Sequence, residues 1–338
     1  MKFVVAETVE EWHEAFDLAA QVFTLHSAME DYTDKKAKLW FEDPTHALNN
    51  LILAKTDTQK IVGLVRFIPR TFRGPDRTFS SVGFSSVCIA PALRGKGYSL
   101  PLMRFSIETA DNRGFDFSFL IARKKLDHFY TKFGFWGVSS YNRVFVTSAP
   151  CIDGEVAIKF HPADPGCLSQ FDQAYRKSYA STLGWMERDK RHWRFLLTVA
   201  QNLGMRFLSV VRDGNVIGYA VLNDHEVCEI ALLDETEFQA VVNALNATFY
   251  DDAHKISCLV SAEHMLVGAL SDQDLSINYR ECPWGGHMVR LLRGTSMQSE
   301  DPSYADTLKW LGARSISRPT GNGGKLLPAF NFSLIDEI

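Results

Sequence analysis

A chain of 338 residues is comfortable for two domains, and 46% hydrophobic residues suffice for two packed cores. The formal net charge of −4 gives no reason to expect a nucleic acid or an anionic membrane as partner. No apolar run approaches the roughly 20 residues that span a bilayer, residues 1–11 do not resemble a signal peptide, and the cysteines and histidines lack metal-ligand spacing. We therefore expect a cytoplasmic protein that binds no metal.

The first half of the chain alternates between helical and strand patterns. Apolar residues recur at helical spacing over residues 9–23, and again from residue 100 until Gly114 stops the helix. Another helix is expected after Thr33, running towards residue 41. The remaining elements expected in this half are strands over 51–55, 61–68, 78–89 and 117–122, a helix over 126–133, and one or two closing strands over 137–146.

The second half repeats this order. Its expected elements are helices over 167–179, 189–199 and 236–249 and strands over 207–212, 216–222, 227–233 and 256–261. The pattern relaxes near 149–155, so we expect domains over 1–150 and 155–295 with a C-terminal extension over 296–338. The sequence around Gly63 (IVGLV) matches that around Gly218 (VIGYA), and aligning Cys88 with Cys228 extends the match, which indicates internal duplication.

The most informative stretch is V-C-I-A-P-A-L-R-G-K-G-Y-S, residues 87–99. It is typical of a strand that Pro91 ends, a glycine-rich loop and the start of a helix. The two glycines let the backbone come close to a ligand, and the helix beginning near Leu100 adds its positive dipole end at the same place. Together with Arg94 and Lys96, these groups predict an anion site that suits a diphosphate.

This stretch has neither Walker spacing nor a third glycine for G-x-G-x-x-G, because Leu100 stands at that position. It contains a shortened R-x-G-x-G/A and resembles the acetyl-CoA-binding motif of the GNAT superfamily of N-acetyltransferases. Further along, the run F-Y-T-K-F-G-F over 129–135 is similar to a second element of that superfamily. The resemblance implies an α/β fold, more closely an α+β mixed sheet flanked by helices, with acetyl-CoA as co-substrate.

The resemblance carries over residue by residue to a donor site. The strand at 87–89 would pair through its backbone with the pantetheine arm and offer an N–H to the developing oxyanion. Cys88 has no activating neighbour and is expected to be a buried thiol. The expected donor-binding residues are Val87, Cys88, Ile89, Arg94, Gly95, Lys96, Gly97, Tyr98 and Ser99.

For catalysis, Tyr130 matches the family position whose phenol protonates the coenzyme thiolate, while the alternative is that this tyrosine only packs. A phenol with a pKa near 10 can donate this proton without ionising at neutral pH. Many members of the family place a glutamate base on the strand before the loop, but here the strand over 79–89 contains no acid. A water relay, Glu30 or Asp31 before the second helix, and the terminal carboxylate of Ile338 stay open as routes for the proton of the amine.

The second half has no equivalent of the glycine loop. Asp234, Glu235 and Glu237 follow its matching strand, and they would repel a diphosphate. The layout therefore resembles the two-GNAT acetyltransferases, including the enhanced-intracellular-survival aminoglycoside acetyltransferases, with a second module that has lost its donor site. We expect that module to act as a scaffold and as a wall of the acceptor pocket.

Together these features predict an acetyl-CoA-dependent N-acetyltransferase. The expected acceptor is a primary amine on a small molecule, such as an amino sugar, an aminoglycoside or a polyamine-like compound. A peptide or protein N-acetyltransferase and a non-catalytic acyl-CoA-binding regulatory module stay open as alternatives, and so does a homo-oligomer.

Overall fold

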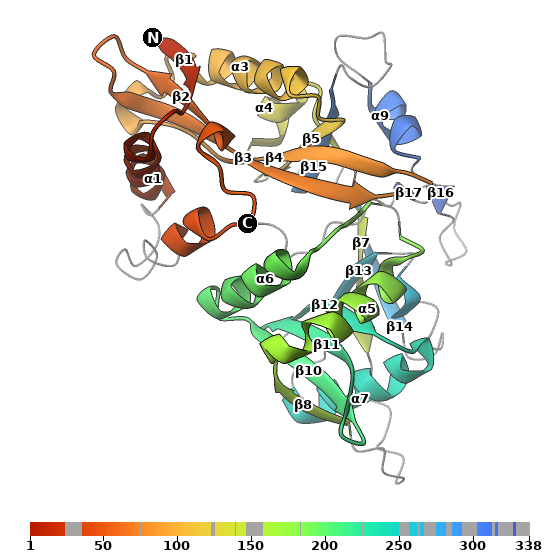
Figure 1. Ribbon diagram of the computed structural model, residues 1–338. Coiled ribbons are helices and arrows are strands. Elements are labelled where there is room, and N and C mark those ends of the chain that lie inside the picture. Colours follow the sequence, from red (N-terminus) through yellow and green to blue (C-terminus); the bar gives the residue numbers. More distant parts are fainter. Residues whose placement is uncertain are drawn as a thin grey trace.

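Two large mixed β-sheets, one above the other in Figure 1, form the framework of the chain, and helices pack against each. This confirms the expected α/β architecture. The computed structural model describes residues 1–23, 36–74, 76–122, 126–138, 140–146, 158–182, 184–224, 226–249, 257–261, 264–266, 275–281, 286–292, 303–312, 315–316 and 327–328.

The helices and strands lie close to the expected ranges in both halves. Up to residue 146 they are β1 (Lys2–Val5), α1 (Val9–Phe23), a helical segment at 36–41, the 3-10 helix η1 (Leu48–Asn50), β2 (Leu51–Lys55), β3 (Ile61–Arg73), β4 (Thr78–Ile89), η2 (Pro91–Leu93), α3 (Ser99–Asn112), β5 (Phe117–Ala122), α4 (Asp127–Thr131), β6 (Trp136–Gly137) and β7 (Ser140–Val146).

From residue 158 onward a similar series follows. Its members are β8 (Ile158–Pro162), η4 (Pro165–Cys167), α5 (Leu168–Tyr179), β9 (Trp185–Met186), α6 (Lys190–Asn202), β10 (Arg206–Arg212), β11 (Asn215–Asn223), β12 (Glu226–Leu232), η5 (Glu235–Glu237), α7 (Phe238–Phe249), β13 (Ser257–Ser261), β14 (Leu275–Glu281), β15 (Gly286–Leu291), α9 (Tyr304–Leu311), β16 (Ser315–Ile316) and β17 (Leu327–Pro328).

The two large sheets share one plan. The first has the strand order β1-β2-β3-β4-β5-β15-β6, and the second, read from its β8 edge, has the order β8-β10-β11-β12-β13-β7-β14. In each sheet the fourth and fifth strands are parallel and the other neighbours are antiparallel. This common plan supports an internal duplication.

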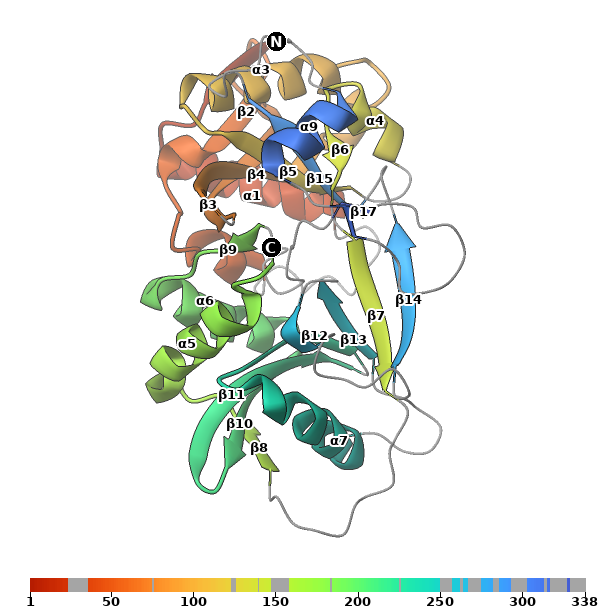
Figure 2. The ribbon, with the colours of Figure 1, turned by 90° about the vertical axis from the view of Figure 1, so that its right-hand side faces the viewer.

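The sixth strand of each sheet comes from the other half of the chain. β15 lies between β5 and β6 in the first sheet, and β7 lies between β13 and β14 in the second (Figure 2). We expected residues 137–146 to close the first sheet, and for β7 this is wrong. The division into 1–150 and 155–295 stays a proposal about modules along the sequence, since each sheet contains one strand from beyond that boundary.

The ladders also show which residues of the two halves correspond. Gly63 of β3 and Gly218 of β11 each lie opposite the last residue of the next strand, β4 and β12 respectively. Counting back from those two ends, Cys88 corresponds to Ala231 and not to Cys228. The expected alignment of Cys88 with Cys228 is therefore wrong by three positions, although the alignment of Gly63 with Gly218 is compatible with the register.

The two halves are also joined by packing. β9, which follows α5, pairs with the end of β3 through Phe72 and Met186, and the buried Leu39 packs in the core beneath α5 and α6. The C-terminal helix α9 packs against the first sheet, where Leu311 lies with Val289 of β15. The helical segment at 36–41 is thus held between the first sheet and the second half.

Candidate active site

In the described residues, the parallel strands β4 and β5 of the first sheet are paired only at one end. β4 pairs with β5 from Ser81 to Gly83, and beyond this point no ladder pair between the two strands occurs in the described residues. Ser86 has a φ of 52° and lies in a β-bulge, where the register between β3 and β4 shifts. Burial also falls here, because residues 85–87 are half-buried whereas 81–84 are buried. The open edge of β4 can therefore pair with an extended ligand.

The predicted glycine loop follows directly. Gly95 and Gly97 have φ values of 75° and 82°, which favour glycine. A side chain at either position would meet no atom within 4 Å, so the loop is bounded by open space. Arg94 and Lys96 are exposed beside the glycines, and α3 begins at Ser99. Two cations and a helix N-terminus thus face solvent at the end of the open strand, as an anion site requires.

Tyr130 lies on the short helix α4 and is only 6% exposed. Its ring packs against Phe129 and Phe135, at centroid distances of 5.1 and 6.2 Å. Ile89 belongs to the same buried cluster, and Val87 and Tyr98 pack against it from the rim. The structure therefore brings together residues of the strand, the glycine loop and the F-Y-T-K-F-G-F run, which the two motifs singled out separately.

Cys88 points to the other side of the sheet, where it packs with Trp12 and Leu64. Burial raises the pKa of its thiol to about 12, so the group is protonated at neutral pH. This confirms the interpretation of Cys88 as a buried thiol, and only its backbone can serve the donor site.

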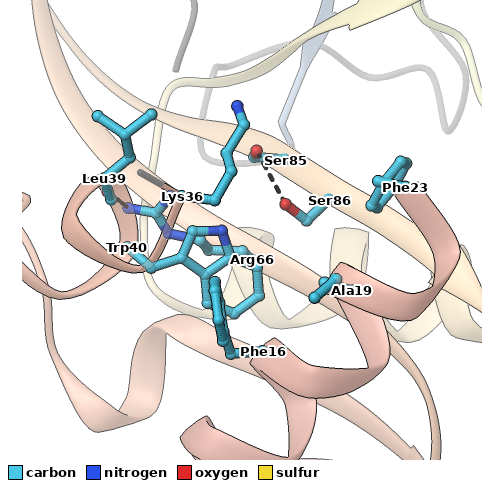
Figure 3. Close-up of a pocket in the computed structure, with 10 residues that line it drawn as sticks. Phe16, Ala19, Phe23, Lys36, Leu39, Trp40, Arg66, Ser85 and Ser86 are labelled. Atoms are coloured by element: carbon cyan, nitrogen blue, oxygen red, sulfur yellow. Dashed lines mark hydrogen bonds between the residues drawn. The ribbon is translucent and has the colours of Figure 1, made fainter. Parts of the chain in front are cut away.

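A cavity of about 170 Å³ lies on this opposite side, against the bulge of β4 (Figure 3). α1 and the helical segment at 36–41 supply apolar walls, while β3 and β4 supply polar groups. Its lining consists of Phe16, Ala19, Ala20, Phe23, Lys36, Leu39, Trp40, Arg66, Ser85 and Ser86. The sequence analysis missed Arg66 and the two serines, although Arg66 is the one charged residue of the strand expected over 61–68 and could have been noticed.

Arg66 belongs to a buried charge cluster behind the cavity. Asp43 accepts hydrogen bonds from Arg70 through both of its oxygens, at 2.8 and 3.2 Å, and from Arg66 at 3.2 Å. Thr45 adds a hydroxyl at 2.7 Å. Burial alone would raise the pKa of Asp43, but Arg70 and then Arg66 hold it well below its usual range. The carboxylate therefore stays ionised and anchors residue 43 to β3.

We expect Asp43→Asn to destabilise the fold by about 3–5 kcal/mol, because two buried guanidinium groups would lose their counter-charge. Urea denaturation of the variant near pH 7 measures this. Asp57→Asn is the control, since the Asp57 side chain is 89% exposed and pairs with the terminal amine; its effect should stay within about 0.5 kcal/mol.

The effect also has a definite pH dependence. A carboxyl group whose pKa is lowered on folding stabilises the fold above its unfolded value of 3.8 and loses that contribution as the pH falls towards the lower folded value. The stability difference between the wild type and Asp43→Asn should therefore be constant from about pH 5 to 7 and shrink below about pH 4. A difference that stays constant in acid would contradict the role given to Asp43.

The second sheet has neither a glycine loop after β12 nor an unoccupied side of that strand. η5 runs directly into α7 with no loop between Glu237 and Phe238, and Asp234 caps this turn by accepting from the Thr236 N–H. Beside β12, the buried His264 lies 3.1 Å from the carbonyl oxygen of Ile230. The chain itself therefore occupies the open side of β12.

The opposite side of β12 is filled as well. Arg188 donates to both oxygens of Glu229 at 2.7 Å, and the Tyr219 hydroxyl donates to the same carboxylate at 2.5 Å. Trp193 and Tyr175 cover the guanidinium, at 4.8 and 4.0 Å from their ring centroids. Glu229 lies opposite Val221 in the second sheet as Ser85 lies opposite Arg66 in the first, so a buried ion pair stands where the first half has its cavity.

The described residues contain neither a metal-binding group nor a membrane-spanning helix. No group of His, Cys, Asp and Glu there could hold a metal ion, and none of the helices there has the length and apolar character to cross a bilayer. The candidate base residues Glu30, Asp31 and Ile338 lie outside the described residues.

Comparison with known proteins defines the class of this site. Residues 6–139 match the family model of the acetyltransferase (GNAT) domain. This span contains the open strand, the glycine loop and Tyr130. The match identifies the protein as an acyl-CoA-dependent acyltransferase. Residues 6–139 therefore form an acetyltransferase (GNAT) domain. No curated protein has significant sequence similarity to it.

Solved structures show the same fold at low identity. A GCN5-related N-acetyltransferase from Anabaena variabilis has a TM-score of 0.61 at 16% identity, over 86% of this chain and 72% of that one. Eis1 from Mycobacterium abscessus has a TM-score of 0.62 at 14% identity, over 89% and 76%. Saccharomyces cerevisiae N-myristoyltransferase, with bound myristoyl-CoA, has a TM-score of 0.52 at 13% identity, over 85% and 82%. All three cover both halves of the chain.

Proposed function

We propose that this protein transfers an acetyl group from acetyl-CoA directly to a primary amine of a small molecule. One observation carries the proposal: the bulge at Ser86 has the open edge of β4 on one side and the 170 Å³ cavity on the other. A donor held along β4 and an acceptor held in the cavity would meet there without a covalent enzyme intermediate. The thiol of Cys88, two residues along the strand from Ser86, is buried and protonated.

The donor would be held mainly by backbone groups. The strand at Val87–Ile89 would pair with the pantetheine arm, and the turn from Arg94 to Ser99 would bind the diphosphate through its N–H groups and cations. A backbone N–H of the bulge would donate to the oxyanion as the tetrahedral intermediate forms. These roles fit the half-buried backbone and the exposed glycine turn.

Two protons must move in this reaction. The amine loses one as it attacks the thioester, and the departing thiolate gains one, which the Tyr130 hydroxyl would supply. No carboxylate lines the cavity among the described residues, so we propose that a water molecule held by the Ser85 and Ser86 hydroxyls relays the first proton to solvent. The two hydroxyl oxygens lie 3.4 Å apart at the cavity wall.

A panel of amines, assayed by release of free thiol from acetyl-CoA, tests this function. The panel contains small amines, peptides with free N-termini and a protein substrate. Turnover of small amines supports the proposal, and turnover of peptides or proteins alone would favour a peptide acetyltransferase. Tight binding of acetyl-CoA without turnover of any acceptor would favour a regulatory module that binds acyl-CoA.

We further expect one acetyl-CoA to bind per chain. The second half lacks a loop between η5 and α7, presents Asp234 and Glu235 there, and fills the open side of β12 with His264. Calorimetric titration should therefore give a stoichiometry near one. A value near two would show that the second half retains a donor site.

A further inference from the structure

The charge cluster behind the cavity carries a net positive charge. Asp43 is the single carboxylate bonded to both Arg66 and Arg70 in the described residues, so two positive charges share one negative charge. Both arginine side chains are only 3% exposed. A buried excess charge is costly unless an opposite charge compensates it. Arg66 lines the cavity, so an anion bound there could provide that charge.

Arg66 has unused hydrogen-bond donors on the cavity side. Its Nη2 donates to the Leu39 carbonyl at 3.0 Å and to Asp43 at 3.2 Å, whereas Arg70 directs its bonds to Asp43, Thr45 and its neighbouring carbonyl. Within the described part of the chain, no acceptor bonds to Nε or Nη1 of Arg66. A guanidinium with unused donors in a nearly dry site binds carboxylates strongly.

The position of Arg66 is suited to an acceptor molecule. It lies directly opposite Ser85 in the ladder of β3 and β4, next to the bulge at which transfer is proposed. Its guanidinium lies over the ring of Trp40, 5.3 Å from the centroid, as Figure 3 shows. An anionic group held by Arg66 would place an amine a few bonds away near the open backbone of residue 86.

The rest of the described lining agrees in charge and polarity. The described lining contains no acid, and Phe16 and Phe23 form an apolar wall. Resting on the proposed function, we infer that the acceptor is an amino acid or a close analogue: a primary amine with a carboxylate a few bonds away and an apolar side chain. Polyamines and aminoglycosides, which the sequence resemblance favoured, would bring further positive charge to Arg66.

The volume supports the same conclusion. Pockets for drug-sized ligands measure roughly 300–1,000 Å³, whereas this cavity measures about 170 Å³. It therefore suits a molecule the size of a single amino acid better than a multi-ring aminoglycoside.

The test compares phenylalanine with phenylalanine amide, phenethylamine and spermidine as acceptors for acetyl-CoA. The amide has the less basic amine, so chemistry alone favours it at neutral pH. We expect kcat/KM for phenylalanine to exceed that for the amide by about 10- to 100-fold, the range for one hydrogen bond to a charged group. Arg66→Gln should remove this preference, because Asp43 and Arg70 then remain as a balanced pair.

Two control variants separate binding from folding. Arg66→Lys keeps the charge and should retain part of the preference, and Lys60→Gln removes an exposed charge from the turn before β3 and should leave the preference unchanged. Calorimetry provides a readout besides turnover: N-acetylphenylalanine should bind the CoA-loaded wild type more tightly than its amide does, and Arg66→Gln should bind the two equally.

The outcomes distinguish the inference from the function on which it rests. Equal or better turnover of the amide or spermidine would overturn the carboxylate-bearing acceptor while leaving the amine acetyltransferase intact. Acetyl-CoA binding without turnover of any amine, and without binding of N-acetylphenylalanine, would overturn both.

Discussion

Turnover of Tyr130→Phe should fall by about 10²- to 10⁴-fold, the usual contribution of a general acid. The substitution keeps the ring that packs against Phe129 and Phe135 and removes only the hydroxyl. Acetyl-CoA affinity should change little, because the glycine turn that would bind the diphosphate is untouched. Steady-state kinetics, under conditions where the chemical step limits the rate, measure the effect.

Tyr175→Phe provides the matched control. Tyr175 is also buried but lies on α5 in the second half, in the core that α5 shares with α6. Its loss of a hydroxyl should leave turnover within a few-fold of the wild type. If Tyr130→Phe behaves in the same way, Tyr130 only packs, and the thiolate must take its proton from water or from another residue.

Gly97→Asp should abolish measurable binding of acetyl-CoA. The φ of 82° disfavours any side chain here, and the open space beside this glycine is where the proposed diphosphate would lie, so a carboxylate would repel it. Arg94→Ala should weaken binding more mildly, by about tenfold, because it removes one charge-assisted hydrogen bond. Calorimetry of both variants gives the two affinities.

Gly114→Asp separates backbone strain from the loss of the site. Gly114 has a φ of 74°, and a side chain at this position would likewise meet no atom within 4 Å, but it lies beyond the opposite end of α3. This variant should lose some stability and keep its affinity for acetyl-CoA. Normal binding by both Gly97→Asp and Arg94→Ala would refute the assignment of the turn to the donor.

The local structure of the proposed donor side was predictable from the sequence because it depends on neighbouring residues. A strand, a turn with two glycines and a helix start are consecutive in the chain, and the F-Y-T-K-F-G-F run supplies Tyr130 in one short segment. The acceptor side depends on contacts between distant residues. Arg66 meets Asp43 across 23 positions and faces α1 across many more, and no periodicity in a single sequence encodes such pairs.

The exchange of β7 and β15 was unpredictable for a related reason. Either strand has a pattern that fits a sheet of its own half, and the choice of partner depends on how the two halves pack together. The same holds for the register of β12, where two cysteines in similar strands favoured an alignment that the ladder does not follow. Local pattern predicted the elements well, but it did not determine which sheet each strand joins.

The exchanged strand also sets the order in which the protein can be made. β6 pairs only with β15 among the described strands, so it joins the first sheet only after residues 286–291 have left the ribosome. At about 5–20 residues per second, that is roughly 8–30 s after β6 itself is synthesised. During this interval the nascent chain presents β5 as an open sheet edge, the kind that pairs with other chains. The catalytic half is first in the sequence, yet its sheet is among the last parts of the protein to be completed.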